Sequence, residues 1–284
     1  MTAHTFTRIR YATTSVEGGS IATITLDRPD SANALDSTTI DELDAAMDLA
    51  EADSDVRVVV IAGAGKHFCA GHDLKELFAG QSEWAAMRGT AEGKWHHEQV
   101  MYFDRCVRIR DFRLPTIAAV HGACSAAGLM LASMCDLIVA TTDARFSNPV
   151  LRMSGAGVEL LVEPWELGPR RAKEFLLCAT TLTGVDAQQI GLVNRTVEPG
   201  ADPSAAVGAA AALMAAEVAL VPTVTAQAVK ASINHMVDGM GQRDSWRHHF
   251  MIHQFVSNTA TALGLMAQRT EGGMQHVKRE QGGE

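Results

Sequence analysis

The fold of this chain is decided by two stretches, His67-Phe-Cys-Ala-Gly-His-Asp-Leu-Lys-Glu76 and His121-Gly-Ala-Cys-Ser-Ala-Ala-Gly-Leu-Met130. Each follows a short, almost continuous apolar run and leads into a segment with helical character. A strand that is buried on both faces of a parallel sheet has this continuous apolar pattern. The two stretches therefore predict strand-to-helix turns at the carboxyl ends of parallel strands, where open α/β sheets bind ligands.

Strands and helices alternate around these two turns. Strands are predicted at 21–26, 56–62, 116–120, 137–141 and 192–197, and helices at 38–52, 74–110 with a break near 89–93, 125–134 and 186–190. This order predicts an α/β fold with a parallel sheet and crossover helices. The pattern is helical from 201 to about 269, and the Gly-rich, polar segment 271–284 is expected to fray. We expect an α/β core over 1–200 and a helical region over 201–284.

Composition narrows the class of protein. The net charge of −9 gives no support for binding to nucleic acid or to an anionic membrane surface, and an anionic ligand needs local cations or N–H groups. The five cysteines are odd in number and form no C-x-x-C pair, which indicates a reduced, cytoplasmic chain. Residues 1–10 lack the apolar core of a signal peptide, and the Ala-rich run 205–216 is too short to span a bilayer.

Both turns are rich in small residues, which let a ligand approach the backbone closely. Free N–H groups at the start of a helix favour an anion or a polarised oxygen. For either turn alone, ordinary turn chemistry is the simpler interpretation, because Gly-rich motifs are weak signals by themselves.

Together the two turns resemble those of the crotonase (enoyl-CoA hydratase/isomerase) family. Five further segments match in consistent order: Leu26-Asp-Arg-Pro-Asp-Ser-Ala-Asn-Ala-Leu35, Pro115-Thr-Ile-Ala-Ala-Val-His-Gly122, Met134-Cys-Asp-Leu-Ile-Val-Ala140, Ala144-Arg-Phe-Ser147 and Ala187-Gln-Gln-Ile-Gly-Leu-Val193. The resemblance implies a crotonase-like spiral core of stacked β-β-α turns and a helical C-terminal trimerisation region. It also implies a homotrimer or a hexamer built as a dimer of trimers, and an acyl-CoA thioester as substrate.

The resemblance also implies positions for the oxyanion hole, the pair of backbone N–H groups that hold the thioester oxygen. The N–H of His72, which follows Gly71, is the first donor, and the N–H of Ala127 is the second. One such donor contributes roughly 3–4 kcal/mol to transition-state stabilisation. The residues expected to contact the CoA thioester are Arg28, Ser31, Ala70, Gly71, His72, Asp73, Leu74, Met130 and Val150. Arg28 and Lys75 are candidate phosphate contacts, or else exposed charges.

The chain departs from the family pattern where the hydratases have two glutamates that activate water. The matching positions here are Met130 and Val150, and neither side chain transfers a proton. A positioned acid–base group contributes typically ~10²–10⁴-fold to a rate. Glu159 lies close to where some isomerases of the family have a catalytic acid, and burial is expected to raise its pKa. The alternative for Glu159 is a carboxylate at a helix start.

Several histidines and cysteines admit more than one role. The side chain of His72 either reaches the acyl group or makes a loop hydrogen bond. His121 is expected to cap a turn, and 95–97 to line the acyl pocket. His249 and His253 have i, i+4 spacing without a third ligand, so we expect a solvated helix face and no metal. Cys69 and Cys124 are expected to be small buried fillers rather than nucleophiles.

The function predicted from these residues is that of an enzyme classed as an enoyl-CoA hydratase, a lyase of fatty-acid or related acyl-CoA metabolism. The proposed catalytic residues are His72 and Ala127, through their N–H groups, and Glu159 as a proton carrier. The alternatives are an enoyl-CoA isomerase, a thioester hydrolase, or a non-catalytic acyl-CoA-binding protein. No cofactor is expected, because coenzyme A is part of the substrate.

Overall fold

The computed structural model describes residues 5–78, 87–153 and 156–265. Its main sheet has six strands in the order β1-β2-β3-β4-β6-β9. The strands are β1 (Ile9–Val16), β2 (Gly19–Leu26), β3 (Val56–Gly63), β4 (Thr116–Val120), β6 (Leu137–Thr141) and β9 (Arg195–Val197). Only the β1–β2 pair is antiparallel, and β2 through β9 pair in parallel. The predicted α/β class and parallel sheet are confirmed.

A second, three-stranded sheet stands beside the carboxyl ends of these strands. It has the order β5-β7-β8, formed by β5 (Ala123–Ser125), β7 (Arg145–Ser147) and β8 (Thr181–Thr183). β5 follows β4 after two residues and β7 follows β6 after three, and the two strands pair in parallel. The predicted helix at 125–134 begins later than expected, because residues 123–125 form β5.

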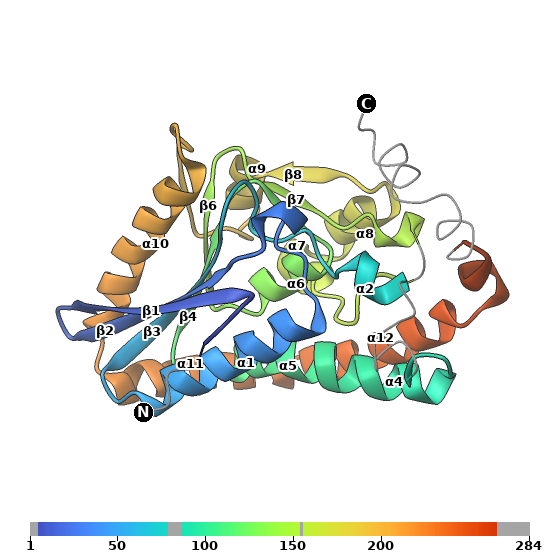
Figure 1. Cartoon of the computed structure of the whole chain (residues 1–284), viewed down its shortest axis with the longest axis horizontal. Helices are drawn as coiled ribbons and strands as arrows, with labels where there is room; N and C mark the ends of the chain where they lie inside the picture. The colour runs from blue at the N-terminus through green and yellow to red at the C-terminus, as the bar shows by residue number, and fades with distance from the viewer. Residues whose placement is uncertain (1–4, 79–86, 154–155, 266–284) are drawn as a thin grey trace.

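Helices cover both sides of the main sheet (Figure 1). They are α1 (Ser37–Ala52), α2 (Leu74–Phe78), α4 (Ala91–Glu98), α5 (Arg105–Asp111), α6 (Ala127–Ser133), α7 (Glu163–Leu167), α8 (Pro169–Leu177), α9 (Gly184–Gln189), α10 (Pro203–Ala219), α11 (Thr223–Gly239) and α12 (Gln242–Ser257). Short helices η1 (Pro29–Ser31) and η3 (Val150–Arg152) and the π-helical turn η2 (Gln99–Asp104) complete them. The predicted break near 89–93 is confirmed, because α4 begins at Ala91.

The core has two parts, one on each face of the main sheet. α10 packs its apolar face, including Val207, Ala211 and Met214, against Val58 and Ile117 of the sheet. The larger part, on the other face, includes α1, η2, α5 and α6. The predicted division at residue 200 stays a prediction, although α10 buries part of the sheet.

The C-terminal helices lie along α5 and α4. Arg110 at the end of α5 pairs with Asp238 of α11 at 2.9 Å, and Trp95 of α4 meets Phe250 of α12 edge-on at 5.4 Å. α12 is thereby brought beside α4 (Figure 1). The fraying predicted for 271–284 lies outside the described residues. No single helix among the described residues is long and apolar enough to cross a membrane, although α10 and α11 together, bent by 105°, meet the length and composition criteria.

Candidate active site

The two strand-to-helix turns lie side by side and are joined by backbone hydrogen bonds. Cys69 of the first turn pairs with Cys124 of the second in a parallel bridge. The N–H of Cys69 donates to the carbonyl of Ala123 at 3.1 Å, and the N–H of Ser125 donates to the carbonyl of Cys69 at 3.0 Å. Gly128 fits beneath this bridge only because it has no side chain, since a Cβ there would lie 2.3 Å from the Cys69 carbonyl oxygen.

This packing brings together the two predicted N–H donors. The bridge between Leu35 and the second half of the first turn uses the carbonyl of Gly71 and the N–H of Asp73, so the N–H of His72 takes part in neither bond. Ala127 is the first residue of α6, and the first N–H groups of a helix have no partner within it. A Cβ on Gly71 would lie 3.4 Å from the nitrogen of Ala127, so the two turns are in contact at this point.

The backbone conformation of Gly71 and Ala126 sets the direction of the N–H groups of His72 and Ala127. Gly71 has φ +105°, and Ala126 has φ +51° and ψ −117°, both in the left-handed half of the backbone map. An L-residue at positive φ costs about 1–2 kcal/mol, and such strain is held in place only by the surrounding structure. Here the N–H of Ala126 donates to the carbonyl of Ser147 at 2.9 Å, and the Oγ atoms of Ser125 and Ser147 lie 2.7 Å apart. β7 therefore fixes the start of α6.

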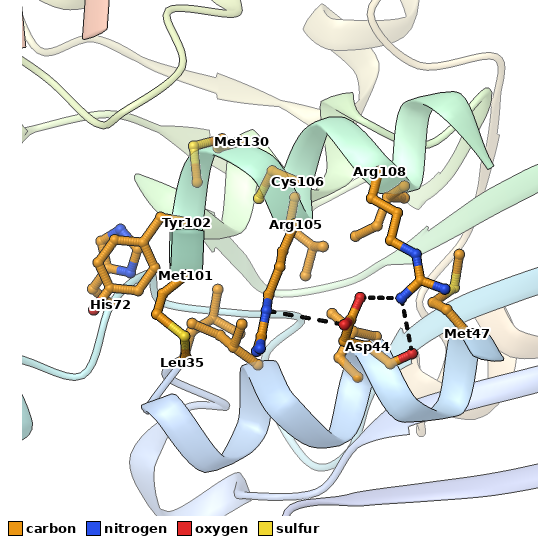
Figure 2. Close-up of a pocket in the computed structure, with 14 residues that line it drawn as sticks. Leu35, Asp44, Met47, His72, Met101, Tyr102, Arg105, Cys106, Arg108 and Met130 are labelled. Carbon is orange, nitrogen blue, oxygen red and sulfur yellow. Dashed lines mark hydrogen bonds and ion pairs between the residues drawn. The ribbon is translucent and has the colours of Figure 1, made fainter. Parts of the chain in front are cut away.

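An apolar pocket begins beside these donors and runs between α1 and the η2–α5 segment (Figure 2). Its cavity volume is about 30 Å³, so side chains fill most of the space between these elements. The lining residues are Leu35, Ile40, Leu43, Asp44, Met47, His72, Met101, Tyr102, Arg105, Cys106, Arg108, Ile109, Met130 and Leu131. His72, Tyr102 and Met130 lie at one end, and at the other end Arg105 and Arg108 pair with Asp44.

The side chain of His72, at one end of this pocket, contacts the carboxylate of Glu159. Nε2 of His72 lies 2.9 Å from Oε2 of Glu159, whose side chain is only 3% exposed. Burial favours the neutral carboxyl, but the charge and hydrogen bond of His72 outweigh it and lower the pKa of Glu159. The raised pKa expected for a buried Glu159 is therefore wrong, because the sequence did not show its partner.

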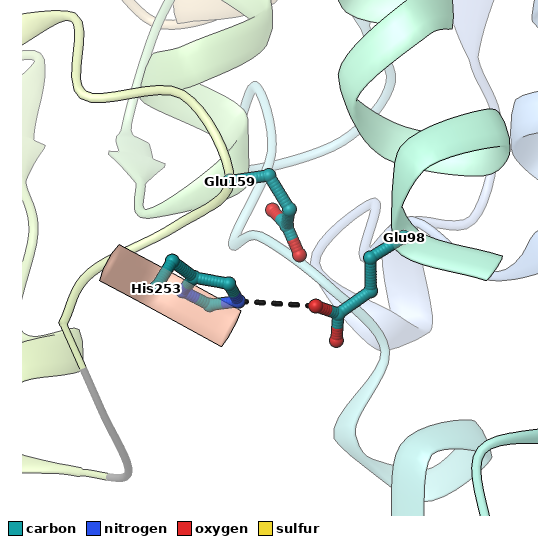
Figure 3. Close-up of side chains that lie close together, drawn as sticks. All are labelled: Glu98, Glu159 and His253. Atoms are coloured by element: carbon teal, nitrogen blue, oxygen red, sulfur yellow. Dashed lines mark hydrogen bonds and ion pairs between the residues drawn. The ribbon is translucent and has the colours of Figure 1, made fainter. Parts of the chain in front are cut away.

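A second pair lies directly behind Glu159. Nε2 of His253, on α12, is 3.1 Å from Oε2 of Glu98, on α4. In Figure 3 the carboxylates of Glu98 and Glu159 point toward each other and toward the imidazole, and one ligand atom from each of the three lies within 4.8 Å of the other two. Glu98 also accepts from Arg88 at 2.8 Å and from Gln254 at 2.5 Å.

Cations surround the two carboxylates of this cluster: Arg88, His253 and Lys94, whose Nζ lies 4.0 Å from Oε1 of Glu98. Burial alone would raise the pKa of Glu98, but the hydrogen bond to His253 and the charge of Arg88 hold it well below its usual range. Burial alone would lower the pKa of His253, but its hydrogen bond to Glu98 and the charge of Glu159 raise it. Two carboxylates and an imidazole can together bind a metal ion. Here the carboxylate of Glu98 already accepts hydrogen bonds from Arg88, His253 and Gln254, so the arrangement favours a charged hydrogen-bond network.

The residues expected to contact CoA lie around the two turns. Ala70 and Lys75 are exposed, and Gly71 and Asp73 are buried. The guanidinium of Arg28 pairs with Asp73 at 2.7 Å and with Asp36 at 3.2 Å, so its charge is largely neutralised within the chain.

The remaining predicted contacts flank the same region. Ser31 ends η1 and is half-buried, as is Leu74 at the start of α2. Met130 is buried in α6 and lines the pocket, and half-buried Val150 begins η3. The apolar surroundings of Met130 contain no replacement carboxylate, and the only acid that reaches His72 among the described residues is Glu159.

The solvated face expected for the α12 histidines is wrong. Both His249 and His253 are 8% exposed, because α12 packs against α4 and against the loop that contains Glu159. Nε2 of His249 lies 2.9 Å from the carbonyl oxygen of Val158, and burial lowers the pKa of His249 to about 4. The i, i+4 spacing correctly indicated that the two histidines lie on one face of a helix, but that face is buried.

The expectations for the remaining cysteines and histidines are met in part. Cys69 and Cys124 are fully buried, and burial raises the pKa of Cys69 to about 12, which confirms their role as fillers. His121 contacts the carbonyl of Gly65 in the first turn at 2.8 Å, as expected of a capping residue. Residues 95–97 are absent from the described pocket lining, which Met101 and Tyr102 provide instead.

Sequence reasoning missed Glu98, Arg88 and Tyr102. Glu98 and Arg88 look like ordinary helix-surface charges in the sequence, and Tyr102 looks like core. The ring of Tyr102 lies 4.0 Å from the ring of His72, centroid to centroid. The available signal was the pair of α12 histidines, which needed a buried carboxylate to face.

The fold and this site define an enzyme class, and comparison with known proteins identifies it. The chain belongs to the enoyl-CoA hydratase/isomerase family, also called the crotonase family, whose model matches residues 17–269.

Individual relatives agree with this assignment. The EchA13 protein of Mycobacterium tuberculosis, whose name places it provisionally among the enoyl-CoA hydratases, is 40% identical over 262 residues, covering 88% of this chain and 80% of that protein. A probable enoyl-CoA hydratase of Mycobacterium smegmatis has a similar structure, with a TM-score of 0.78, 38% identity, and coverage of 87% of this chain and 93% of that one. An enoyl-CoA hydratase/isomerase of Xanthobacter autotrophicus Py2 gives a TM-score of 0.84 at 30% identity, covering 96% of both chains.

Proposed function

We propose that this enzyme acts on 2-enoyl-CoA thioesters as an enoyl-CoA hydratase, with the thioester oxygen held by the N–H groups of His72 and Ala127. The observation that supports this proposal is the contact between the two turns, because Ala127 at the start of α6 lies against the turn of His72, which itself lines an apolar pocket. A donor of this kind stabilises the enolate oxygen as charge develops on it, by roughly 3–4 kcal/mol. The acyl chain would lie against Met130 and Val150, and no separate cofactor is required.

Proton transfer falls to the pair of Glu159 and His72, because Met130 and Val150 have no titratable group. A single acid–base pair also suits double-bond isomerisation, in which one group removes a proton from one carbon and returns it to another. Isomerase activity is therefore the second candidate function.

The first test is the loss of conjugated-thioester absorbance when the purified enzyme meets a panel of 2-enoyl-CoA substrates, with product analysis. Formation of 3-hydroxyacyl-CoA would support hydration. Migration of the double bond in a 3-enoyl-CoA, without hydration, would support isomerisation. Release of free CoA thiol would replace both with hydrolysis, and binding without any conversion would leave a non-catalytic acyl-CoA-binding protein.

We also propose a homotrimer or a dimer of trimers. The support is α11, which exposes large apolar side chains along its length: Val224, Val229, Ile233 and Met236, followed by exposed Met240 just after the helix. Light scattering on the purified chain tests this assembly. A cytoplasmic location and a role in fatty-acid metabolism belong to the same proposal, and five free cysteines suit a reducing compartment.

A further inference from the structure

We propose that the imidazole of His72 is itself the acid–base group of this site, and that Glu159 is a positioning residue behind it. The inference rests on the proposed function, because it requires an acyl-CoA thioester at the N–H groups of His72 and Ala127. It assigns two roles to one residue: the backbone of His72 holds the oxygen, and its side chain moves the proton.

His72 and Glu159 differ in their access to the pocket. His72 lines the pocket, whereas Glu159 is not among the lining residues that the structure describes. Figure 2 shows the ring of His72 at the end of the pocket beside Tyr102, and Figure 3 shows Glu159 turned toward Glu98. Of these two residues, His72 is therefore the one that a ligand in this pocket would contact.

The two ring nitrogens of His72 lie in different surroundings. With Glu159 ionised, Nε2 of His72 donates its hydrogen to Oε2 of Glu159 at 2.9 Å. This bond selects the tautomer in which Nδ1 has the lone pair. Nδ1 is buried and has no hydrogen-bond partner among the described residues. A nitrogen in this state is poised to take a proton from a ligand and to return it, with the carboxylate stabilising the imidazolium in between.

His72 and Glu159 are both held in place by their surroundings. The backbone of the turn is fixed on both sides of His72 by hydrogen bonds to Leu35, and the ring packs on Tyr102 with its centroid 4.0 Å away. Behind the ring, the charge of His253 attracts Glu159, and the bond of His249 to the carbonyl of Val158 anchors the residue before Glu159. A base held this firmly loses little entropy on reaction.

The resulting step needs no reagent besides water. In hydration, Nδ1 takes a proton from water as the water oxygen bonds to C3 of the enoyl group. The electron pair of the C2–C3 double bond moves to form the enolate, whose oxygen the two N–H groups hold. The proton then passes from Nδ1 to C2, which restores the thioester carbonyl and the neutral imidazole. In isomerisation, the same atom takes a proton from C2 and returns it to C4.

The test compares His72→Gln with Glu159→Gln, using His96→Gln and Glu92→Gln on the exposed side of α4 as matched controls. Two readouts are measured: conversion of the substrates that wild type converts, and exchange of the α-protons of butyryl-CoA with D₂O by NMR. His72→Gln should lower both rates by ~10²–10⁴-fold. Its affinity for butyryl-CoA should change by less than about threefold, because the main-chain N–H remains.

Glu159→Gln separates a positioning role from a purely structural one. An amide can donate as well as accept a hydrogen bond, so the new side chain would no longer select the tautomer of His72 in which Nδ1 has the lone pair. The kcat of Glu159→Gln should fall by roughly tenfold or more, while its KM should change by less than about threefold, because Glu159 is not among the described residues that line the pocket. Retention of activity by His72→Gln, or an unchanged kcat in Glu159→Gln, would overturn the inference. If His72→Gln does not fold, as judged by thermal unfolding, the kcat and KM of Glu159→Gln decide. Wild type that neither converts nor exchanges any acyl-CoA would instead refute the proposed function.

Discussion

The two halves of this site are built in opposite ways. The oxyanion donors come from two turns that follow neighbouring strands, and backbone hydrogen bonds with glycine at 71 and 128 hold them. The proton-handling half is assembled from side chains of four separate segments: His72, Glu98 on α4, Glu159 in a loop and His253 on α12. The first half depends on close backbone packing, and the second depends on buried charges that pair with one another.

This difference teaches where each half is vulnerable. The backbone half fails when a turn moves by a fraction of an ångström, with little change in charge. The buried cluster fails when one charge is removed, because its partners are left in a poorly solvated interior. The following variants separate these two kinds of failure.

Among the variants that change the backbone of the two turns, the largest loss of activity is expected in Gly128→Ala. The new Cβ would lie 2.3 Å from the Cys69 carbonyl oxygen, so the two turns must separate. A displacement of about 1 Å in such a site costs roughly 10²-fold in rate. The turnover of Gly128→Ala should therefore fall by about that factor. Gly208→Ala in α10 is the control, because nothing lies within 4 Å of its Cβ, and equal losses in both variants would contradict the packing argument.

The buried cluster should respond to Glu98→Ala mainly through stability. The substitution leaves Arg88 and His253 buried without their carboxylate. Removal of one partner from a buried ion pair costs about 3–5 kcal/mol, which urea unfolding should show. Glu92→Ala, exposed in the same helix, should cost less than about 1 kcal/mol. A loss in Glu98→Ala no larger than in Glu92→Ala would mean that the network contributes nothing to folding.

His249 predicts a dependence of stability on pH. Its pKa is lowered by burial from 6.5 to about 4, so the unfolded chain binds the proton more tightly than the folded chain. Stability should therefore fall as the pH drops from 6.5 to 4, by at most ~3 kcal/mol from this residue. His249→Gln should flatten the pH dependence of unfolding over this range. An unchanged slope would show that His249 titrates alike in both states.

The smallest expected effect is a gain, in Ala126→Gly. Positive φ destabilises an L-residue by about 1–2 kcal/mol, so its removal raises the free energy of unfolding. The extra freedom of glycine in the unfolded chain lowers that free energy by about 0.5–1 kcal/mol. Thermal unfolding should show a net stabilisation of about 0.5–1 kcal/mol with the active-site turns intact. Ala209→Gly, exposed in α10, should instead lose about 1 kcal/mol. A loss of stability in Ala126→Gly would show that the positive φ of Ala126 does not destabilise the folded chain.

Much of the fold was predictable from the sequence alone. Continuous apolar runs at 56–62, 116–120 and 137–141 predicted parallel strands, and all three lie in the main sheet. β1 was missed because its alternation is weak: of its eight residues only Ile9 is buried. β5 was missed because it has only three residues, which form a strand by pairing with β7, about twenty residues further along the chain.

The site, too, was predictable only in part from the sequence. The sequence by itself determined the two glycine-rich turns, the positions of His72 and Ala127, and the apolar residues Met130 and Val150, because these depend on local backbone chemistry and on identity at a position. Only the tertiary structure decided the partner of His72, the direction in which the pKa of Glu159 moves, and the burial of His249 and His253. Each of these depends on charges that lie far apart in the sequence, and buried charges act through distance in space rather than through spacing along the chain.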